Sequence, residues 1–162
     1  MVKDLERMNK YFKVPLRLPS NFIEINGGIG SLRAMRFLTS IDNNSDGRLT
    51  EMVTREMFKR IFTNDPGLDI TSKESFLEVG MKAGVKKDFL LDSIEMMESE
   101  KVKNSLRSNT DEAISHKAFG VPTIVAHTVK GPEIFFGNDR IELLAHVLGE
   151  SYQGPVCERY LD

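Results

Sequence analysis

The sequence predicts a mostly helical protein of the α/β class, in which a long helical block precedes a β-hairpin and a final helix. Three observations support this prediction. Apolar residues recur at helical spacing through roughly the first hundred residues. Two short β-branched and aromatic runs, Thr123–His127 and Glu133–Phe136, flank turn residues that include Gly131 and Pro132. The segment Arg140–Leu148 then has one apolar face and is followed by a glycine.

Residues 1–117 are expected to form a helical domain with an extended connector at Val14–Asn21, where two prolines disfavour a helix. A capping box of Thr71 and Glu74 is expected to start the fourth helix. Apolar residues expected to face inward include Leu32, Met35 and Met52. The predicted helices cover Lys3–Phe12, Ser31–Ile41, a segment from Thr50 to before Asp65, a segment from Thr71 to Gly84, Lys87–Met97 and Glu100–Lys117.

Residues 118–150 are expected to form a ββα unit, and residues 151–162 a tail. A loop with a proline, a hairpin and a helix, in that order, make the second half of a thioredoxin-like fold. Such folds bind their ligand at that proline, here Pro122. Asp139 and Glu142 have the spacing of a capping box, so Asp139 is expected to cap the last helix.

Composition is that of one compact unit without a strong electric field. The net charge of −2 gives no attraction for nucleic acid or an anionic membrane, and no apolar run approaches the roughly 18 residues of a bilayer span. The single cysteine, Cys157, cannot form an internal disulfide, which fits a reducing compartment. An unreactive tail cysteine is favoured over a reactive thiol.

One motif indicates a different class of protein. The segment Asp42–Thr50 matches the first nine positions of an EF-hand calcium loop, with Gly47 at the sharp turn. Position twelve is Val53, where a bidentate glutamate is needed. We therefore favour an inter-helix loop in which Thr50 is the N-cap of the next helix. The three histidines, His116, His127 and His146, are too scattered in the sequence to predict a metal site.

Several colinear segments resemble the kappa class of glutathione transferases, within the superfamily of DsbA-like disulfide oxidoreductases and 2-hydroxychromene-2-carboxylate isomerases. The resemblance runs from about Lys3 to Pro155. It implies a thioredoxin-like fold with a large helical insertion between its two halves. The segments that carry it are GSLRAMRFLT, KVKNSLRSNTDEA, AFGVPTIVAH and FFGNDRIELLAHVLGE.

The resemblance also implies a part of the family that this sequence does not contain. Kappa-class enzymes begin with a βαβ unit carrying a Ser-Pro-Tyr-like turn, whose serine activates the glutathione thiol. The sequence has no Ser-Pro pair and no Cys-x-x-Cys or Cys-x-x-Ser. We therefore expect a chain that lacks this N-terminal unit, contains no catalytic residue, and is inactive by itself.

The resemblance assigns Val121, Asn138 and Asp139 to glutathione binding, with Pro122 as a structural cis-proline. If the Val121–Pro122 bond is cis, Val121 presents its backbone to an extended peptide such as glutathione. The alternative is an ordinary trans proline before a strand. A helix N-terminus at Asn138 and Asp139 suits the γ-glutamyl carboxylate, and Asp139 can accept from the adjacent ammonium. The alternative for these two residues is capping alone.

The expected function is conjugation of glutathione, a co-substrate and not a cofactor, to hydrophobic electrophiles, with no metal and no other cofactor. The expected partners are a second copy of the chain, glutathione and the electrophile, without nucleic acid or membrane. Kappa enzymes are mitochondrial or peroxisomal, although Tyr160-Leu161-Asp162 is not a peroxisomal signal. Two alternatives remain open: a non-catalytic short isoform that binds a full-length partner, and a disulfide oxidoreductase or isomerase of the same superfamily.

Overall fold

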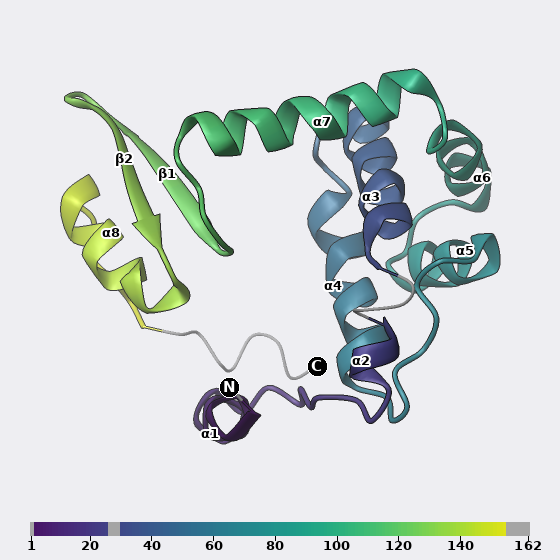
Figure 1. Cartoon of the computed structure of the whole chain (residues 1–162), viewed down its shortest axis with the longest axis horizontal. Helices are drawn as coiled ribbons and strands as arrows, with labels where there is room; N and C mark the ends of the chain where they lie inside the picture. Colours follow the sequence, from purple (N-terminus) through teal and green to yellow (C-terminus); the bar gives the residue numbers. More distant parts are fainter. Residues whose placement is uncertain (1, 26–29, 155–162) are drawn as a thin grey trace. The chain divides into compact units, whose positions relative to one another are not determined.

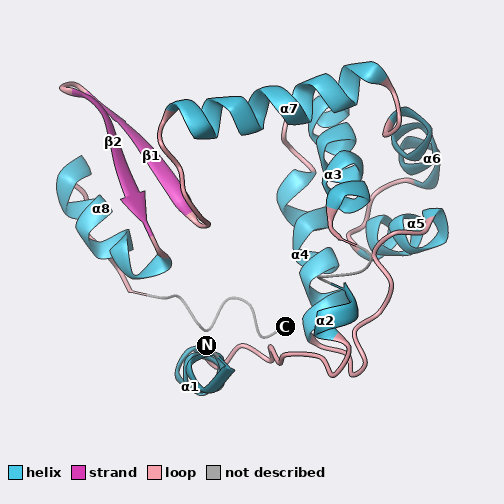
Figure 2. Ribbon diagram, viewed as in Figure 1, coloured by secondary structure: helices cyan, strands magenta, loops and turns pink. Residues whose placement is uncertain are grey.

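The computed structural model describes residues 2–25 and 30–154. The chain divides into two compact units, Met1–Arg107 and Ser108–Asp162, and each is described by itself. Cys157 and Tyr160–Asp162 lie outside the described residues. The fold class is confirmed: helices dominate, and the described strands form a small antiparallel sheet near the end of the chain (Figure 2).

The predicted helices are present, with shifted ends (Figure 1). The main difference is at the second predicted helix, which extends past Ile41 to Ser45. A short helix, α2, follows the connector and was not predicted. The helices are α1 Val2–Phe12, α2 Phe22–Glu24, α3 Leu32–Ser45, α4 Thr50–Phe62, α5 Lys73–Lys82, α6 Lys87–Met96, and α7 Glu100–Ser115, in which the boundary between the two units falls.

The core of the helical unit lies among α3, α4, α5 and α6. At its centre the rings of Phe37 and Phe76 stack with centroids 4.7 Å apart and an interplanar angle of 13°. The prediction that Leu32, Met35 and Met52 face inward is wrong, because all three are exposed. Successive helical residues turn by about 100°, so the face of α3 that buries Phe37 points Leu32 and Met35 elsewhere. In the same way, the face of α4 that buries Val53 points Met52 elsewhere.

Helices α5 and α6 approach so closely that only glycine fits at position 80. A Cβ atom added there would lie 2.2 Å from the Cδ2 atom of Leu90, which is fully buried. Gly80 lies inside α5, where glycine has a poor intrinsic helix propensity. The close contact between the two helices explains the residue.

The predicted capping box of Thr71 and Glu74 is wrong. Ser72 is the N-cap of α5, and its hydroxyl accepts from the Ser75 N–H at 3.2 Å. Asp69 organises this turn, because its carboxylate accepts from the N–H and hydroxyl of both Thr71 and Ser72. Partial burial raises the pKa of Asp69, but the hydrogen bonds from Ser72 and Thr71 outweigh it and lower that pKa to about 2.

Arg60 joins α4 to α5. Its Nε donates to the Asp69 carbonyl at 2.6 Å, and its Nη1 lies 2.8 Å from Oε2 of Glu78. The other Glu78 oxygen, Oε1, lies 3.0 Å from Lys82 Nζ. Hydrogen bonds from Lys82 and Arg60 lower the pKa of Glu78. The Arg60 side chain is only 12% exposed, so it is held in place between the two helices and is not a mobile surface charge.

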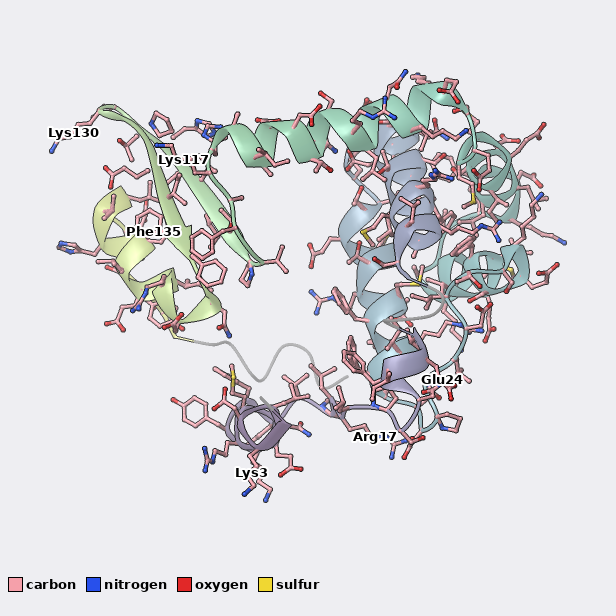
Figure 3. All side chains as sticks on the ribbon, viewed as in Figure 1. Lys3, Arg17, Glu24, Lys117, Lys130 and Phe135 are labelled. Carbon is pink, nitrogen blue, oxygen red and sulfur yellow. The ribbon has the colours of Figure 1, made fainter. Side chains whose placement is uncertain are left out.

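The second unit contains β1, Thr123–Thr128, β2, Gly131–Phe136, a 3₁₀ turn η2, Asn138–Arg140, and α8, Ile141–Leu148. The strands are antiparallel in the register Thr128↔Gly131, Ala126↔Glu133 and Ile124↔Phe135, with Lys130 at the hairpin tip (Figure 3). Opposed residues share a face of a sheet, so the buried Ala126 and Phe135 lie on the same face as Ile124. Helix α8 contacts β1.

The other face of the hairpin is largely open. Ile134 and Phe136 are each 43% exposed on this face, and His127 is exposed too. The predicted turn also differs from the structure, because Gly131 and Pro132 belong to β2 and leave Val129 and Lys130 as the two-residue turn.

Candidate functional site

The loop that leads into β1 contains the first group of predicted site residues. The Val121–Pro122 peptide bond is cis, and Val121 is 91% exposed. Within the described part of the chain, neither the N–H nor the C=O of Val121 has a hydrogen-bond partner. This backbone donor and acceptor are therefore free to pair with an extended peptide.

The loop is held firmly although its surface is open. The Thr123 hydroxyl donates to the Gly120 carbonyl at 2.7 Å. The rings of Phe119 and Phe136 lie with centroids 4.5 Å apart. Gly120 fits beneath this pair, since a Cβ atom there would lie 2.9 Å from the Phe136 ring. These contacts fix the path of the chain before Val121 and thereby the direction of its backbone groups.

Gly137 joins the two predicted parts of the site. Its N–H donates to the Pro122 carbonyl at 3.0 Å, which continues the β1–β2 pairing by one step. The structure thus brings the Val121–Pro122 loop next to Asn138 and Asp139, which lie sixteen or more residues further along the chain. The backbone of Gly137 has a φ of +101°, a conformation that favours glycine.

The second group, Asn138 and Asp139, lies in the 3₁₀ turn that leads into α8. Asp139 is not the predicted cap: the N-cap of α8 is Arg140, and no side chain makes a cap hydrogen bond there. The predicted capping box of Asp139 and Glu142 is therefore wrong, because the 3₁₀ turn precedes α8 and the helix starts one residue later than predicted, at Ile141. The Asp139 side chain is 68% exposed, and its nearest ionic partner is Arg140 Nη1 at 3.6 Å.

The arrangement brings three kinds of binding group together in one small area. Val121 offers an unpaired backbone edge, the start of η2 and α8 offers N–H groups at the positive end of a helix, and Asp139 offers an exposed carboxylate. Together these groups suit an extended peptide that carries an ammonium and a carboxylate at one end.

Sequence reasoning missed the residues that hold this site in place. Gly137 makes the hydrogen bond that joins the two loops, a role that the sequence pattern does not indicate. Phe119 and Gly120 were not singled out. The signal was present, because one aromatic residue stands directly before Gly-Val-Pro and a second one directly before Gly-Asn-Asp, and their rings are in contact.

The calcium motif does not form a calcium loop. Asp42 and Asn44 are inside α3, and the Asp42 carboxylate accepts from the Thr50 hydroxyl at 2.7 Å. The predicted N-cap was off by one residue: Leu49 caps α4 and Thr50 is its first residue. His116 and His127 lie in edge contact, with ring centroids 6.4 Å apart. Among the described residues, no three histidine, cysteine or acidic side chains are grouped to hold a metal ion.

Comparison with known proteins identifies the family. A family model for the DsbA-like thioredoxin domain matches residues 1–149. The chain is 36% identical over 156 residues to glutathione S-transferase kappa 1 of Homo sapiens and to that of Rattus norvegicus, covering 96% of this chain and 68% of each relative. It is 34% identical over 164 residues to glutathione S-transferase kappa 2 of Caenorhabditis elegans, covering 98% of this chain and 69% of the relative.

The chain belongs to the DsbA-like thioredoxin-domain family and, within it, to the kappa class of glutathione transferases. The resemblance stated from the sequence segments is thereby confirmed. Among the described residues, no helix is both long enough and apolar enough to cross a membrane.

Proposed function

We propose that this chain binds glutathione across the junction of the Val121 loop and the η2 turn, as part of a kappa-class transferase site. The observation that carries the proposal is the Gly137-to-Pro122 hydrogen bond, which places a free peptide edge next to an exposed carboxylate and a helix start. The names of the relatives support glutathione as the ligand.

In the proposed complex, the cysteinyl unit of glutathione pairs with the backbone N–H and C=O of Val121 as a short antiparallel strand. The γ-glutamyl end lies at the 3₁₀ turn. Its carboxylate accepts from the Asn138 amide and the N–H groups there, while Asp139 accepts from its ammonium. The Asp139–Arg140 ion pair is exposed and long, so it competes only weakly for that carboxylate.

The reaction that we propose for the site is attack of the glutathione thiolate on a hydrophobic electrophile. A carbon–sulfur bond forms, the leaving group departs with the bonding electrons, and the thiol proton passes to solvent. The resemblance implies a serine hydroxyl that stabilises the thiolate and lowers the pKa of the thiol. The 162 residues contain no Ser-Pro pair, and we propose that they bind glutathione without activating it.

The expected partners and location are part of the same proposal. We propose that the chain assembles with a second copy, acts on a hydrophobic electrophile, uses glutathione as a co-substrate without any cofactor, and is mitochondrial or peroxisomal. These proposals rest on the class to which the chain belongs.

Calorimetric titration of the chain with glutathione tests the binding proposal. We expect binding that Asp139→Ala weakens about tenfold or more, since a hydrogen bond between charged groups is worth about 1.5–3 kcal/mol. Asp111→Ala, which removes an exposed carboxylate from α7, is the matched control and should leave affinity unchanged. Equal affinity of Asp139→Ala and the unsubstituted chain would contradict the proposed role of Asp139.

A further inference from the structure

Two histidines that lie apart in the sequence come together in the second unit. His116 directly follows α7 and His127 lies in β1, and their rings are in edge contact with centroids 6.4 Å apart. Among the described residues, neither imidazole makes a hydrogen bond or an ion pair. A neutral imidazole has one nitrogen with a free lone pair, so the two rings together offer two unused metal ligands.

The backbone that carries His116 is fixed. The His116 N–H donates to the Glu112 carbonyl at 3.1 Å, which continues the hydrogen-bond pattern of α7 by one residue. The next residue, Lys117, has a φ of +61°, and the Ala118 N–H donates to the Ala113 carbonyl at 3.0 Å. This is the hydrogen bond of a Schellman motif, and it ends the helix in one conformation. Figure 3 labels Lys117 where α7 ends and the chain turns towards the hairpin.

The backbone that carries His127 is fixed as well, by the hairpin. His127 lies opposite Pro132, and the following Thr128 hydroxyl donates to the Gly131 carbonyl at 2.8 Å. The His127 side chain is exposed, whereas that of His116 is half-buried. Val121 lies six residues before His127, roughly 20 Å along an extended strand, so the two histidines are separate from the candidate glutathione site.

We propose that His116 and His127 together bind one zinc ion, with water in its remaining positions. Zinc binds imidazole nitrogen at about 2.0–2.1 Å in a tetrahedral arrangement, which places the centroids of two coordinating rings about 5–6 Å apart. A side-chain rotation of the exposed His127 suffices to close the observed 6.4 Å to that range. Magnesium and calcium are excluded, because these ions prefer oxygen ligands.

Holding both rings on fixed backbones favours the ion over binding to a single surface histidine. Once one ring has bound zinc, the second ring is already at a high effective concentration. The bound ion would link the end of α7 to β1 within the second unit, and it takes no part in the proposed transfer of glutathione.

Calorimetric titration of the chain with zinc chloride at about pH 7.5, in the absence of glutathione, tests the proposal. We expect one ion per chain with a Kd on the order of 10 µM, and no binding of magnesium chloride. His127→Phe keeps an aromatic ring against His116 but removes a ligand, and it should weaken zinc binding about tenfold or more. His146→Phe, on an exposed position of α8, is the matched control and should leave the affinity unchanged.

A thermal melt separates ligand loss from unfolding. Without zinc, His127→Phe should melt as the unsubstituted chain does, while excess zinc should raise the melting temperature of the unsubstituted chain only. If His127→Phe unfolds, His116→Phe decides the matter, because it should weaken zinc binding equally. Cys157→Ser tests the one thiol of the chain and should leave zinc binding unchanged.

Three results would overturn the proposal: no zinc binding below about 1 mM, unchanged binding by a folded histidine-to-phenylalanine variant at position 116 or 127, or loss of binding in Cys157→Ser. Because glutathione is absent and its candidate site is not altered, none of these results bears on the proposed transferase function. Failure to bind glutathione would likewise leave the zinc site untouched.

Discussion

Asn21 and Gly67 exchange two hydrogen bonds across 46 residues of sequence. The Asn21 Nδ2 donates to the Gly67 carbonyl at 2.9 Å, and the Gly67 N–H donates to Asn21 Oδ1 at 2.7 Å. The side-chain amide of Asn21 thus pairs with the Gly67 backbone in the way that the backbone of a neighbouring β-strand would. One residue earlier, the Ser20 N–H donates to Asp65 Oδ1 at 2.9 Å and lowers the pKa of that carboxyl. The connector is therefore fastened to the loop after α4.

The first prediction tests this fastening. Asn21→Ala removes both hydrogen bonds and leaves the buried Gly67 backbone without them, so we expect the helical unit to lose about 1–3 kcal/mol of stability. Urea unfolding, followed by helical circular dichroism, measures the loss. Asn104→Ala on an exposed position of α7 is the control and should not destabilise. Equal stability of both variants would show that the pairing contributes nothing.

The second prediction concerns the stability of the fold at low pH. The folded pKa of Asp69 is about 2 and its ordinary value is 3.8, so its ionised form stabilises the fold above pH 3.8 and this contribution is lost as the pH falls through 2. Because most of the Asp69 side chain is exposed to solvent despite its partial burial, we expect Asp69→Asn to cost only about 1 kcal/mol at neutral pH, shrinking towards zero near pH 2. Measuring the free energy of unfolding of both proteins from pH 6 to pH 2 checks this expectation. Asp92→Asn, without a described partner, should track the unsubstituted protein throughout.

The third prediction separates backbone strain from the geometry of the candidate site. A methyl group at position 137 would lie 2.4 Å from Oδ1 of Asp139, whereas one at Gly131, which has a similar φ of +115°, meets nothing within 4 Å. We expect both Gly137→Ala and Gly131→Ala to reduce stability by strain, about 1–3 kcal/mol each. Only Gly137→Ala should also weaken glutathione binding. Equal binding by the two variants would mean that the position of Asp139 does not matter.

The fourth prediction is that calcium does not bind at Asp42–Thr50 with micromolar affinity. Asp42 lies inside α3 and already accepts a hydrogen bond from the Thr50 hydroxyl, and the side chain of Val53 has no oxygen to bind calcium. Titration calorimetry should show no calcium binding at micromolar concentration, while Asp42→Ala should lower the melting temperature through the lost bond. Asp46→Ala, whose side chain is 90% exposed, is the comparison. Micromolar binding that Asp42→Ala abolishes would restore the calcium-site interpretation.

The fifth prediction concerns the free edge of β1. Hydrogen-bonded pairs alternate in an antiparallel ladder, and the Gly137-to-Pro122 bond sets the phase, so the N–H groups of Ile124 and Ala126 point towards β2 and that of Val125 points away. In hydrogen exchange of a monomer, Val125 should exchange much faster than its two neighbours. Strong protection of Val125 would mean that another strand, such as one from a second copy, pairs with this edge.

The order and type of the elements could be predicted because they depend on local patterns. The apolar spacing of the helices and the β-branched runs of the hairpin are visible in the sequence, and Pro132 even stands at a position where its missing N–H costs no ladder bond. The predicted starts of some helices were wrong because a distant or unexpected hydrogen-bond acceptor determines where the helix begins, as Asp69 does for α5. The two parts of the candidate site were found by resemblance. The Gly137 bond that joins them depends on strand register, which the length of the hairpin turn fixes, and the turn residues were predicted wrongly.

The contact between Gly80 and Leu90 has a consequence for divergence within the family. In any relative that keeps leucine at the second position, even alanine at the first would collide with the buried leucine side chain and force it to move within the core. A larger residue at position 80 therefore requires a smaller one at position 90. These two positions, which lie outside the candidate site, should change together or not at all when many such sequences are aligned.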